Sequence, residues 1–160
     1  MRKTSSIRSN GVNPLWHMYR TVSFIKVAKN FVVIESGRIC PSVKLKRHLY
    51  RIFLGMKIGN KTSIAYKAMP DLMFPERITI GDNSVIGYNA TLLTHEYLID
   101  EYRIGNIEIG SNVLIGANAL VLPGVTIGDN AIIGAMTLVS KDVPENSFAY
   151  GNPMIIKNKV

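Results

Sequence analysis

An aliphatic residue returns at every sixth position along much of this 160-residue chain, usually followed at once by glycine. The period is six, not the 3.6 of an amphipathic helix or the two of a half-buried strand. It indicates one short strand and one bend in each unit. The repeat starts are Ile58 and Ile64, then Ile80, Ile86 and Leu92, then Ile109, Ile115, Val121, Ile127, Ile133 and Val139.

The residue four places after each start is small or β-branched in ten of the eleven repeats, and Glu96 is the exception. Three six-residue units close a triangular coil, and such coils stack at the ~4.8 Å spacing of β-strands. The aliphatic residue then points into the column, and the small residue fits where the interior narrows. Gly-Asp-Asn or Gly-Ser-Asn at 81–83, 110–112 and 128–130 suits the bends, because glycine and asparagine tolerate positive φ. The sequence predicts an all-β solenoid.

Two interruptions of the repeat must leave the column as loops, because their lengths are not multiples of six. The first loop is expected near 70–78, and the second, near 94–106, begins with Thr-His-Glu-Tyr. Loops on a regular scaffold often carry binding and chemistry. We therefore expect a basic, mostly helical segment at 1–57, the solenoid at 58–143 and a C-terminal tail at 144–160.

Only one of the three histidines, His95, lies in the repeat region, whereas His17 and His48 precede it. A histidine beside a loop is, taken alone, most often an ordinary surface or half-buried residue. Imidazole can nevertheless accept a proton near neutral pH, because its unperturbed pKa is about 6.5. His95 is the candidate general base, and the sequence around it decides between these readings.

Residues 58 to about 156 resemble the bacterial hexapeptide-repeat O-acetyltransferases that act on maltose, galactosides, serine and related hydroxyl compounds. The resemblance is densest from Ile109 to Pro153, where Pro-Gly-Val, Lys-Asp-Val-Pro and Gly-Asn-Pro follow in the family's order. It implies a left-handed parallel β-helix and a homotrimer with acetyl-CoA between neighbouring columns. It also implies direct acetyl transfer in a ternary complex, with His95 as general base and no metal.

The whole chain, including MPDLMFPE and THEY, further resembles a bacterial subgroup of acetyltransferases. Neither resemblance identifies the acceptor beyond a hydroxyl of a small molecule or saccharide. Amino acceptors also occur on related scaffolds.

The resemblance assigns the coenzyme to the outside of the column. Ala117 and Ala135 match residues whose main chain contacts the pantetheine arm, although a narrow coil favours alanine there in any case. Ser140 and Lys141 match a polar and basic pair near the nucleotide, and Lys141 could equally be an ordinary surface lysine.

The contact with the coenzyme's 3′-phosphate departs from the family pattern. The family has a basic residue two places after Gly-Asn-Pro, but Ile155 stands there in this chain. Lys157 or Lys159 is the candidate replacement.

Three residues are candidates for the acceptor side of the site. Asp71 matches the region where the family has a polar residue facing the histidine, and it could orient a hydroxyl or the imidazole. Pro-Asp could equally form a simple turn at this point. Glu96 and Tyr97 follow His95 directly and are expected to shape the acceptor pocket.

The net charge of +8 is concentrated at the N-terminus. Residues 1–57 hold twelve Lys or Arg against Glu35 alone, whereas the other 103 residues hold seven basic and ten acidic groups. Charge without a recognisable module does not support nucleic-acid binding. Basic residues also break the apolar run from Leu15 to Ile34, which argues against a signal peptide or a spanning helix. With one cysteine, Cys40, a cytoplasmic location is expected.

Two helices are expected in the basic segment, over Leu15–Ile34 and within KLKRHLYRIFLG, where Gly55 is a plausible stop. One interpretation is that they cap the open end of the solenoid. The other is reversible contact with the anionic inner face of a membrane. Both can hold together. The apolar face expected for the second helix consists of Leu45, Leu49, Ile52 and Phe53.

Two other functions are conceivable on a scaffold of this kind. A γ-type carbonic anhydrase needs three histidine ligands for zinc at each interface, which one histidine in the repeat region cannot supply. A non-catalytic trimeric scaffold or membrane-surface adaptor stays open, although His95 and the intact repeats argue against it.

Overall fold

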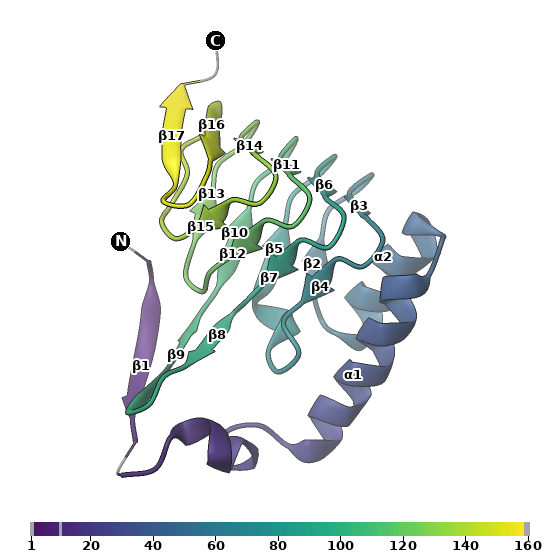
Figure 1. The fold of residues 1–160 in the computed structure, drawn as a ribbon. Helices are drawn as coiled ribbons and strands as arrows, with labels where there is room; N and C mark the ends of the chain where they lie inside the picture. Colours follow the sequence, from purple (N-terminus) through teal and green to yellow (C-terminus); the bar gives the residue numbers. More distant parts are fainter. Residues whose placement is uncertain (1, 10, 159–160) are drawn as a thin grey trace.

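The structure is a computed structural model that describes residues 2–9 and 11–158, so the candidate Lys159 lies outside the described residues. Three parallel sheets form the walls of a triangular prism, and each coil adds one strand to each wall (Figure 1). The first sheet holds β2 (Lys57–Ile58), β5 (Ile78–Ile80), β10 (Ile107–Ile109) and β13 (Thr126–Ile127). The second holds β3 (Ser63–Ile64), β6 (Val85–Ile86), β11 (Leu114–Ile115), β14 (Ile132–Ile133) and β16 (Ser147–Tyr150). The third holds β4 (Met69–Pro70), β7 (Thr91–Leu92), β12 (Leu120–Val121) and β15 (Leu138–Val139).

The six-residue repeat fills the interior of this prism, as predicted. Repeat starts pair with one another in register, so that Ile58, Ile80, Ile109 and Ile127 stack on the first sheet. All eleven starts are at most 4% exposed, and the small residues at the fourth position are buried as well. Burying each large aliphatic side chain contributes roughly 1.5–3 kcal/mol, so the column of starts dominates the stability of the prism.

The predicted bends are confirmed. Asn83, Asn112 and Asn130 have φ values of 52°, 56° and 59°, in the left-handed region that asparagine tolerates. Their side chains form a ladder between coils, in which Asn83 Nδ2 donates to Asn112 Oδ1 at 2.8 Å. Sequence and stacking therefore agree at the corners as well as in the core.

The N-terminal segment is less helical than expected. Residues Thr4–Arg8 form strand β1, and Pro14–Arg20 form a short 3-10 helix that ends before helix α1 (Phe24–Ile39). The helix predicted over Leu15–Ile34 is thus broken near Thr21. Helix α2 (Val43–Phe53) confirms the second predicted helix, with the Ser42 hydroxyl accepting from the N–H of Leu45.

The face of α2 that the fold buries is only partly the one predicted, because Leu49 alone of the four predicted residues packs against the core. Lys46 and Tyr50 are 1% and 0% exposed, whereas Leu45, Ile52 and Phe53 are about half exposed. Lys46 is tolerated because its Nζ donates to the carbonyl of Ala65 at 2.9 Å, and burial lowers the pKa of this amine. The tertiary contact, not the apolar periodicity, chooses the buried side.

Helices α1 and α2 cover the N-terminal end of the prism (Figure 1). Ile34, Tyr50, Leu54 and Met56 join the apolar core of the repeats, which agrees with the capping interpretation. No helix among the described residues is long and apolar enough to cross a membrane.

The C-terminal segment is not a tail. Strand β16 extends the second sheet in parallel with β14, and β17 (Ile155–Asn158) turns back to pair with β16 in antiparallel fashion. This hairpin ends the second sheet at the far end of the prism.

Candidate functional site

Both loops leave the prism at the same corner. The first connects β4 to β5 and the second connects β7 to β10, so each runs from the third sheet to the first sheet, on neighbouring coils. Pro70, the last residue of β4, lies directly beside Leu92, the last residue of β7. The residues that follow, Asp71 and Thr94-His95, are therefore brought together by the stacking of two coils.

The second loop forms a β-hairpin of β8 (His95–Tyr97) and β9 (Glu101–Gly105). Strand β1 pairs with β9 and completes a three-stranded antiparallel sheet. Successive side chains of a strand point to opposite faces, so His95 and Tyr97 share one face and Glu96 lies on the other. The sequence predicted the loop but not this sheet.

Asp71 is the centre of the hydrogen bonds that fix the site. Its Oδ1 accepts from the backbone N–H groups of Met73 and Phe74 at 2.8 and 2.9 Å. Its Oδ2 accepts from the N–H of Thr94 and lies 2.7 Å from Nδ1 of His95. The carboxylate is fully buried, and it orders both loops at once.

The charge state of Asp71 sets the tautomer of His95. Burial raises the pKa of this carboxyl, but the contacts with His95 and the backbone donors of Phe74 and Thr94 outweigh it, so the pKa lies below the ordinary value. An ionised carboxylate can only accept hydrogen bonds, so Nδ1 of His95 carries the proton. In the neutral ring Nε2 then has a free lone pair.

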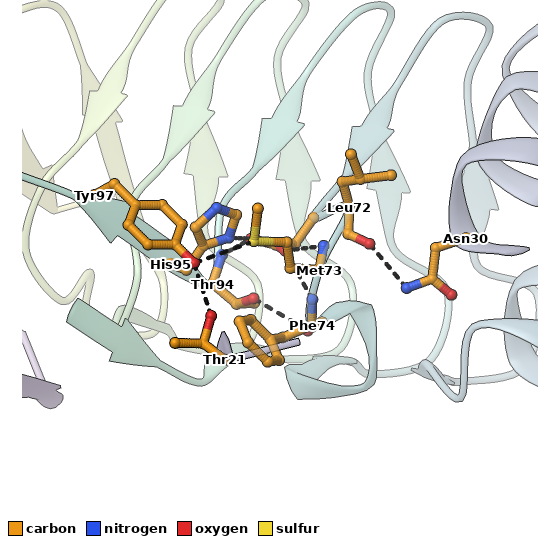
Figure 2. Close-up of polar contacts among 9 residues, drawn as sticks. Thr21, Asn30, Leu72, Met73, Phe74, Thr94, His95 and Tyr97 are labelled. Carbon is orange, nitrogen blue, oxygen red and sulfur yellow. Dashed lines mark hydrogen bonds and ion pairs between the residues drawn. The ribbon is translucent and has the colours of Figure 1, made fainter. Parts of the chain in front are cut away.

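Aromatic and sulfur-containing side chains surround the imidazole (Figure 2). The ring centroid of His95 lies 6.0 Å from that of Phe74 and 5.4 Å from that of Tyr97, both in edge-on geometry. The side chain of His95 is 15% exposed. Its position is thus fixed by packing as well as by Asp71, while part of the ring remains open to a ligand.

Tyr97 connects the hairpin to the N-terminal segment. Its hydroxyl lies 3.0 Å from Oγ1 of Thr21 and donates to Sδ of Met73 at 3.7 Å (Figure 2). Burial raises the pKa of Tyr97, so the phenol stays protonated at neutral pH. Glu96, by contrast, accepts a salt bridge from Arg2 at 2.9 Å on the opposite face. The structure brings Asp71 and Tyr97 to His95, and it turns Glu96 away.

The coenzyme candidates form two groups on the outside of the prism. Ala117 and Ala135 stack at the corner between the second and third sheets, where the N–H of Met136 donates to the carbonyl of Ala117. Ala117 is half-buried and Ala135 is exposed. Tyr66 and Tyr88 occupy the equivalent positions of the first two coils. The alanines therefore leave a shallow strip on the later coils only.

Ser140 and Lys141 lie at the other edge of the third sheet, on the corner from which the hairpin leaves, and Lys157 lies on β17. All three are exposed. Within one chain the third sheet separates the alanine strip from His95. The structure does not bring Ala117 and Ala135 together with the histidine in a single subunit, whereas Ser140 and Lys141 lie on the corner that carries the hairpin of His95.

Several residues near His95 carried no sequence signal. Thr21 reaches Tyr97 from 76 positions away. In the sequence, Phe74 and Met73 are ordinary apolar residues of a loop. Thr94 stood beside His95 but gave no reason to expect that its N–H binds Asp71. The described residues contain no group of three or more His, Cys, Asp or Glu side chains that could hold a metal ion.

Comparison with known proteins gives consistent matches. The model of the bacterial transferase hexapeptide (six repeats) matches residues 106–141, and that of the hexapeptide repeat of succinyl-transferase matches residues 77–93. The chain is 57% identical over 156 residues to "Putative acetyltransferase YvoF" of Bacillus subtilis (strain 168), covering 98% of this chain and 91% of that protein.

Two further relatives carry a sugar acceptor in their names. Galactoside O-acetyltransferase of Lactococcus lactis subsp. lactis (strain IL1403) is 36% identical over 118 residues, covering 69% of this chain and 57% of that protein. The solved structure of a galactoside acetyltransferase in complex with coenzyme A has a TM-score of 0.68 and 26% identity, covering 85% of this chain and 82% of that one.

Proposed function

Because the chain belongs to the family of hexapeptide-repeat acetyltransferases, we propose that it transfers the acetyl group of acetyl-CoA to a hydroxyl of a small molecule or saccharide, with His95 as general base. The observation that carries this proposal is the contact of 2.7 Å between Asp71 Oδ2 and His95 Nδ1. It leaves Nε2 as the basic atom of a ring that is held in place but not completely buried.

The reaction needs one proton to move. Acetyl-CoA supplies the acetyl group as a thioester. Nε2 of His95 takes the proton of the acceptor hydroxyl while its oxygen attacks the carbonyl carbon, and the protonated ring returns that proton to the leaving sulfur. A C–O bond forms, a C–S bond breaks, and Asp71 stabilises the transient imidazolium. Base catalysis of this kind contributes roughly 10²- to 10⁴-fold.

The coenzyme would lie along Ala117 and Ala135, with Ser140, Lys141 and Lys157 near its nucleotide. The small, accessible side chains of the alanine strip support this placement, because backbone groups are reachable there. The strip and His95 lie at opposite edges of the third sheet, so a complete site requires the strip of a neighbouring subunit. A homotrimer provides three such sites.

The walls of the prism support an association of this kind. The outward residues of the second sheet form an apolar row, in which Val85, Leu114 and Phe148 are 42%, 42% and 36% exposed. The outward residues of the first sheet, such as Lys57, Thr79 and Glu108, are polar. A subunit therefore has one wall suited to burial against another and one suited to solvent.

For the acceptor, Tyr97 is the best-placed of the three candidates, because its ring packs on His95. Asp71 acts through the imidazole, since both of its oxygens are already used by protein donors. Glu96 is expected to hold Arg2, not the acceptor. The names of the two galactoside acetyltransferases make a sugar hydroxyl the first acceptor to test.

The test is release of free coenzyme A from acetyl-CoA with a panel of hydroxyl and amino acceptors, including galactosides and maltose. Acceptor-dependent release with hydroxyl compounds supports the proposal. Release with amino acceptors alone would overturn the assignment of O-acetylation. A non-catalytic scaffold would bind partners but release no coenzyme A with any acceptor.

A further inference from the structure

Helix α1 has an apolar side that the fold does not use. On its buried side Ile34 packs on the core of the prism, and Val27 belongs to a second apolar cluster with Val22 and Met73 of the first loop. On the other side, large apolar residues recur seven or eight positions apart, which places them on one face over the whole helix. They are Phe24, Ile25, Phe31, Val32 and Ile39, with exposures from 55% to 78%.

Elements next to α1 also expose large apolar residues. Tyr19 of the 3-10 helix contacts Phe24 in edge-on geometry, with ring centroids 5.4 Å apart. Trp16, the only tryptophan of the chain, is 78% exposed. Helix α2 adds two residues that are at least half exposed. We call the whole set the cap surface: Trp16, Tyr19, Phe24, Ile25, Phe31, Val32, Ile39, Leu45 and Ile52.

The cap surface is accompanied by positive charge that the fold leaves unpaired. The basic residues Arg20, Lys44 and Arg51 are exposed, and no ion pair involving them occurs within residues 2–9 and 11–158. Glu35 is the one acidic residue among the first 57, against twelve basic residues. An apolar, aromatic surface bordered by lysine and arginine is the composition of helices that lie on anionic bilayers.

The positive charge of the N-terminal segment favours a bilayer over a second copy of the chain as the partner of the cap surface. Two copies joined through their cap surfaces would bring two strongly cationic segments together, and they would repel. The apolar wall of the prism, with Val85 and Leu114, is available for side-by-side association, whereas the cap lies at the end of the prism (Figure 1). Packing of prisms through that wall leaves the helical end of each prism uncovered.

The cap surface adjoins the candidate active site. The Thr21 hydroxyl, directly after the 3-10 helix, lies 3.0 Å from that of Tyr97. Lys26 of α1 lies over the ring of Phe74 at 4.9 Å and forms an ion pair with Glu76 of the first loop. Both loops that carry the site thus contact the element that carries the surface.

We propose that the cap surface binds the surface of an anionic lipid bilayer, with its aromatic rings in the headgroup region and its basic residues at lipid phosphates. The chain then lies on the membrane without crossing it. The enzyme would meet acceptors exposed at that surface, and this last step rests on the proposed acetyl transfer. The binding itself does not, and it can be measured without coenzyme A.

Trp16 provides the measurement. The purified full-length chain is mixed with vesicles of phosphatidylcholine alone, or of phosphatidylcholine with phosphatidylglycerol in equal parts, and the emission of Trp16 is followed. We expect a blue shift with the anionic vesicles only, which high salt reverses. Ile25→Ser combined with Val32→Ser should weaken the apparent affinity by roughly tenfold or more. Both positions are exposed, so the variant should fold.

Ile155→Ser is the matched control, because Ile155 is also about half exposed but lies on β17 at the far end of the prism. It should bind anionic vesicles as the unmodified chain does. No blue shift with anionic vesicles, or an equal shift for the double variant and the unmodified chain, would overturn the proposal. A blue shift that grows with protein concentration in the absence of lipid, together with a larger particle in size-exclusion chromatography, would identify a second copy as the occupant and also overturn it.

Discussion

The hydroxyl oxygens of Thr21 and Tyr97 lie 3.0 Å apart, so a residue of the N-terminal segment contacts the ring that packs on His95. The N-terminal segment is therefore part of the architecture of the site, not only a cover for the end of the prism. Its removal should affect the hairpin that carries His95.

Replacing Thr21 by valine tests this contact. Thr21→Val keeps the shape of the side chain but removes its hydroxyl, which also donates to the carbonyl of Met18 at 2.7 Å. Tyr97 then keeps only Sδ of Met73 as a side-chain partner. We expect the free energy of unfolding in urea to fall by about 0.5–1.5 kcal/mol. The matched control is Thr79→Val, on the outward side of the first sheet, which should change it less. An equal effect of both variants would contradict the role of the contact.

Asp71 should make stability depend on pH in the acid range. Its pKa is lower in the folded chain than the ordinary value of about 3.9. Such a carboxyl adds stability that is present above the ordinary pKa and lost as the pH falls through the folded-state value. The unmodified chain should therefore lose stability below about pH 4 more steeply than Asp71→Asn. Urea unfolding at a series of pH values measures both slopes, and identical slopes would be evidence against an ionised Asp71.

Substitutions inside the prism should destabilise the fold more than substitutions on its outer side. Ile80 is 2% exposed and stacked between Ile58 and Ile109. Ile80→Ala should cost about 2–5 kcal/mol through lost burial and a cavity. Thr79→Ala, one residue away but pointing outward, should cost well under half as much. Similar losses for the two would mean that the alternation of the strand is wrong.

The alanine strip should be necessary for coenzyme binding. Ala135→Trp places a large ring on the exposed strip and should weaken the binding of coenzyme A by at least roughly tenfold in calorimetric titration. Glu145→Trp, at another exposed corner of the same region, is the control for the effect of a bulky residue. Unchanged binding of coenzyme A in Ala135→Trp would mean that the coenzyme does not bind at this corner.

The regular part of the molecule could be predicted because each unit depends on its own six residues. Ile58, Ile80, Ile109 and Ile127 stack as the period requires, and asparagine at the corners adopts the φ values that its type permits. Local sequence was sufficient to predict the structure wherever one coil simply lies on the next.

The parts of the fold that could not be predicted depend on contacts between residues distant in sequence. Strand β1 pairs with residues about a hundred positions away, and its own pattern has no buried side to reveal it. In α2 the apolar residues predicted a buried face, of which only Leu49 packs against the core. The most deeply buried residues are Tyr50 and Lys46, which contact Ile34 and Ala65. The contact between Asp71 and His95 was predictable only in part. Two loops at the same corner of adjacent coils must meet even when their lengths differ, but the sequence left open whether Asp71 would orient the imidazole or form a simple turn.

The most direct test of the account is the rate of coenzyme A release by His95→Ala with a saturating hydroxyl acceptor. Circular dichroism and coenzyme A titration should first establish that the variant folds and binds the coenzyme as the unmodified chain does. The account predicts that kcat falls by roughly 10²- to 10⁴-fold. A kcat within a few-fold of the unmodified chain would contradict the role of His95 as general base.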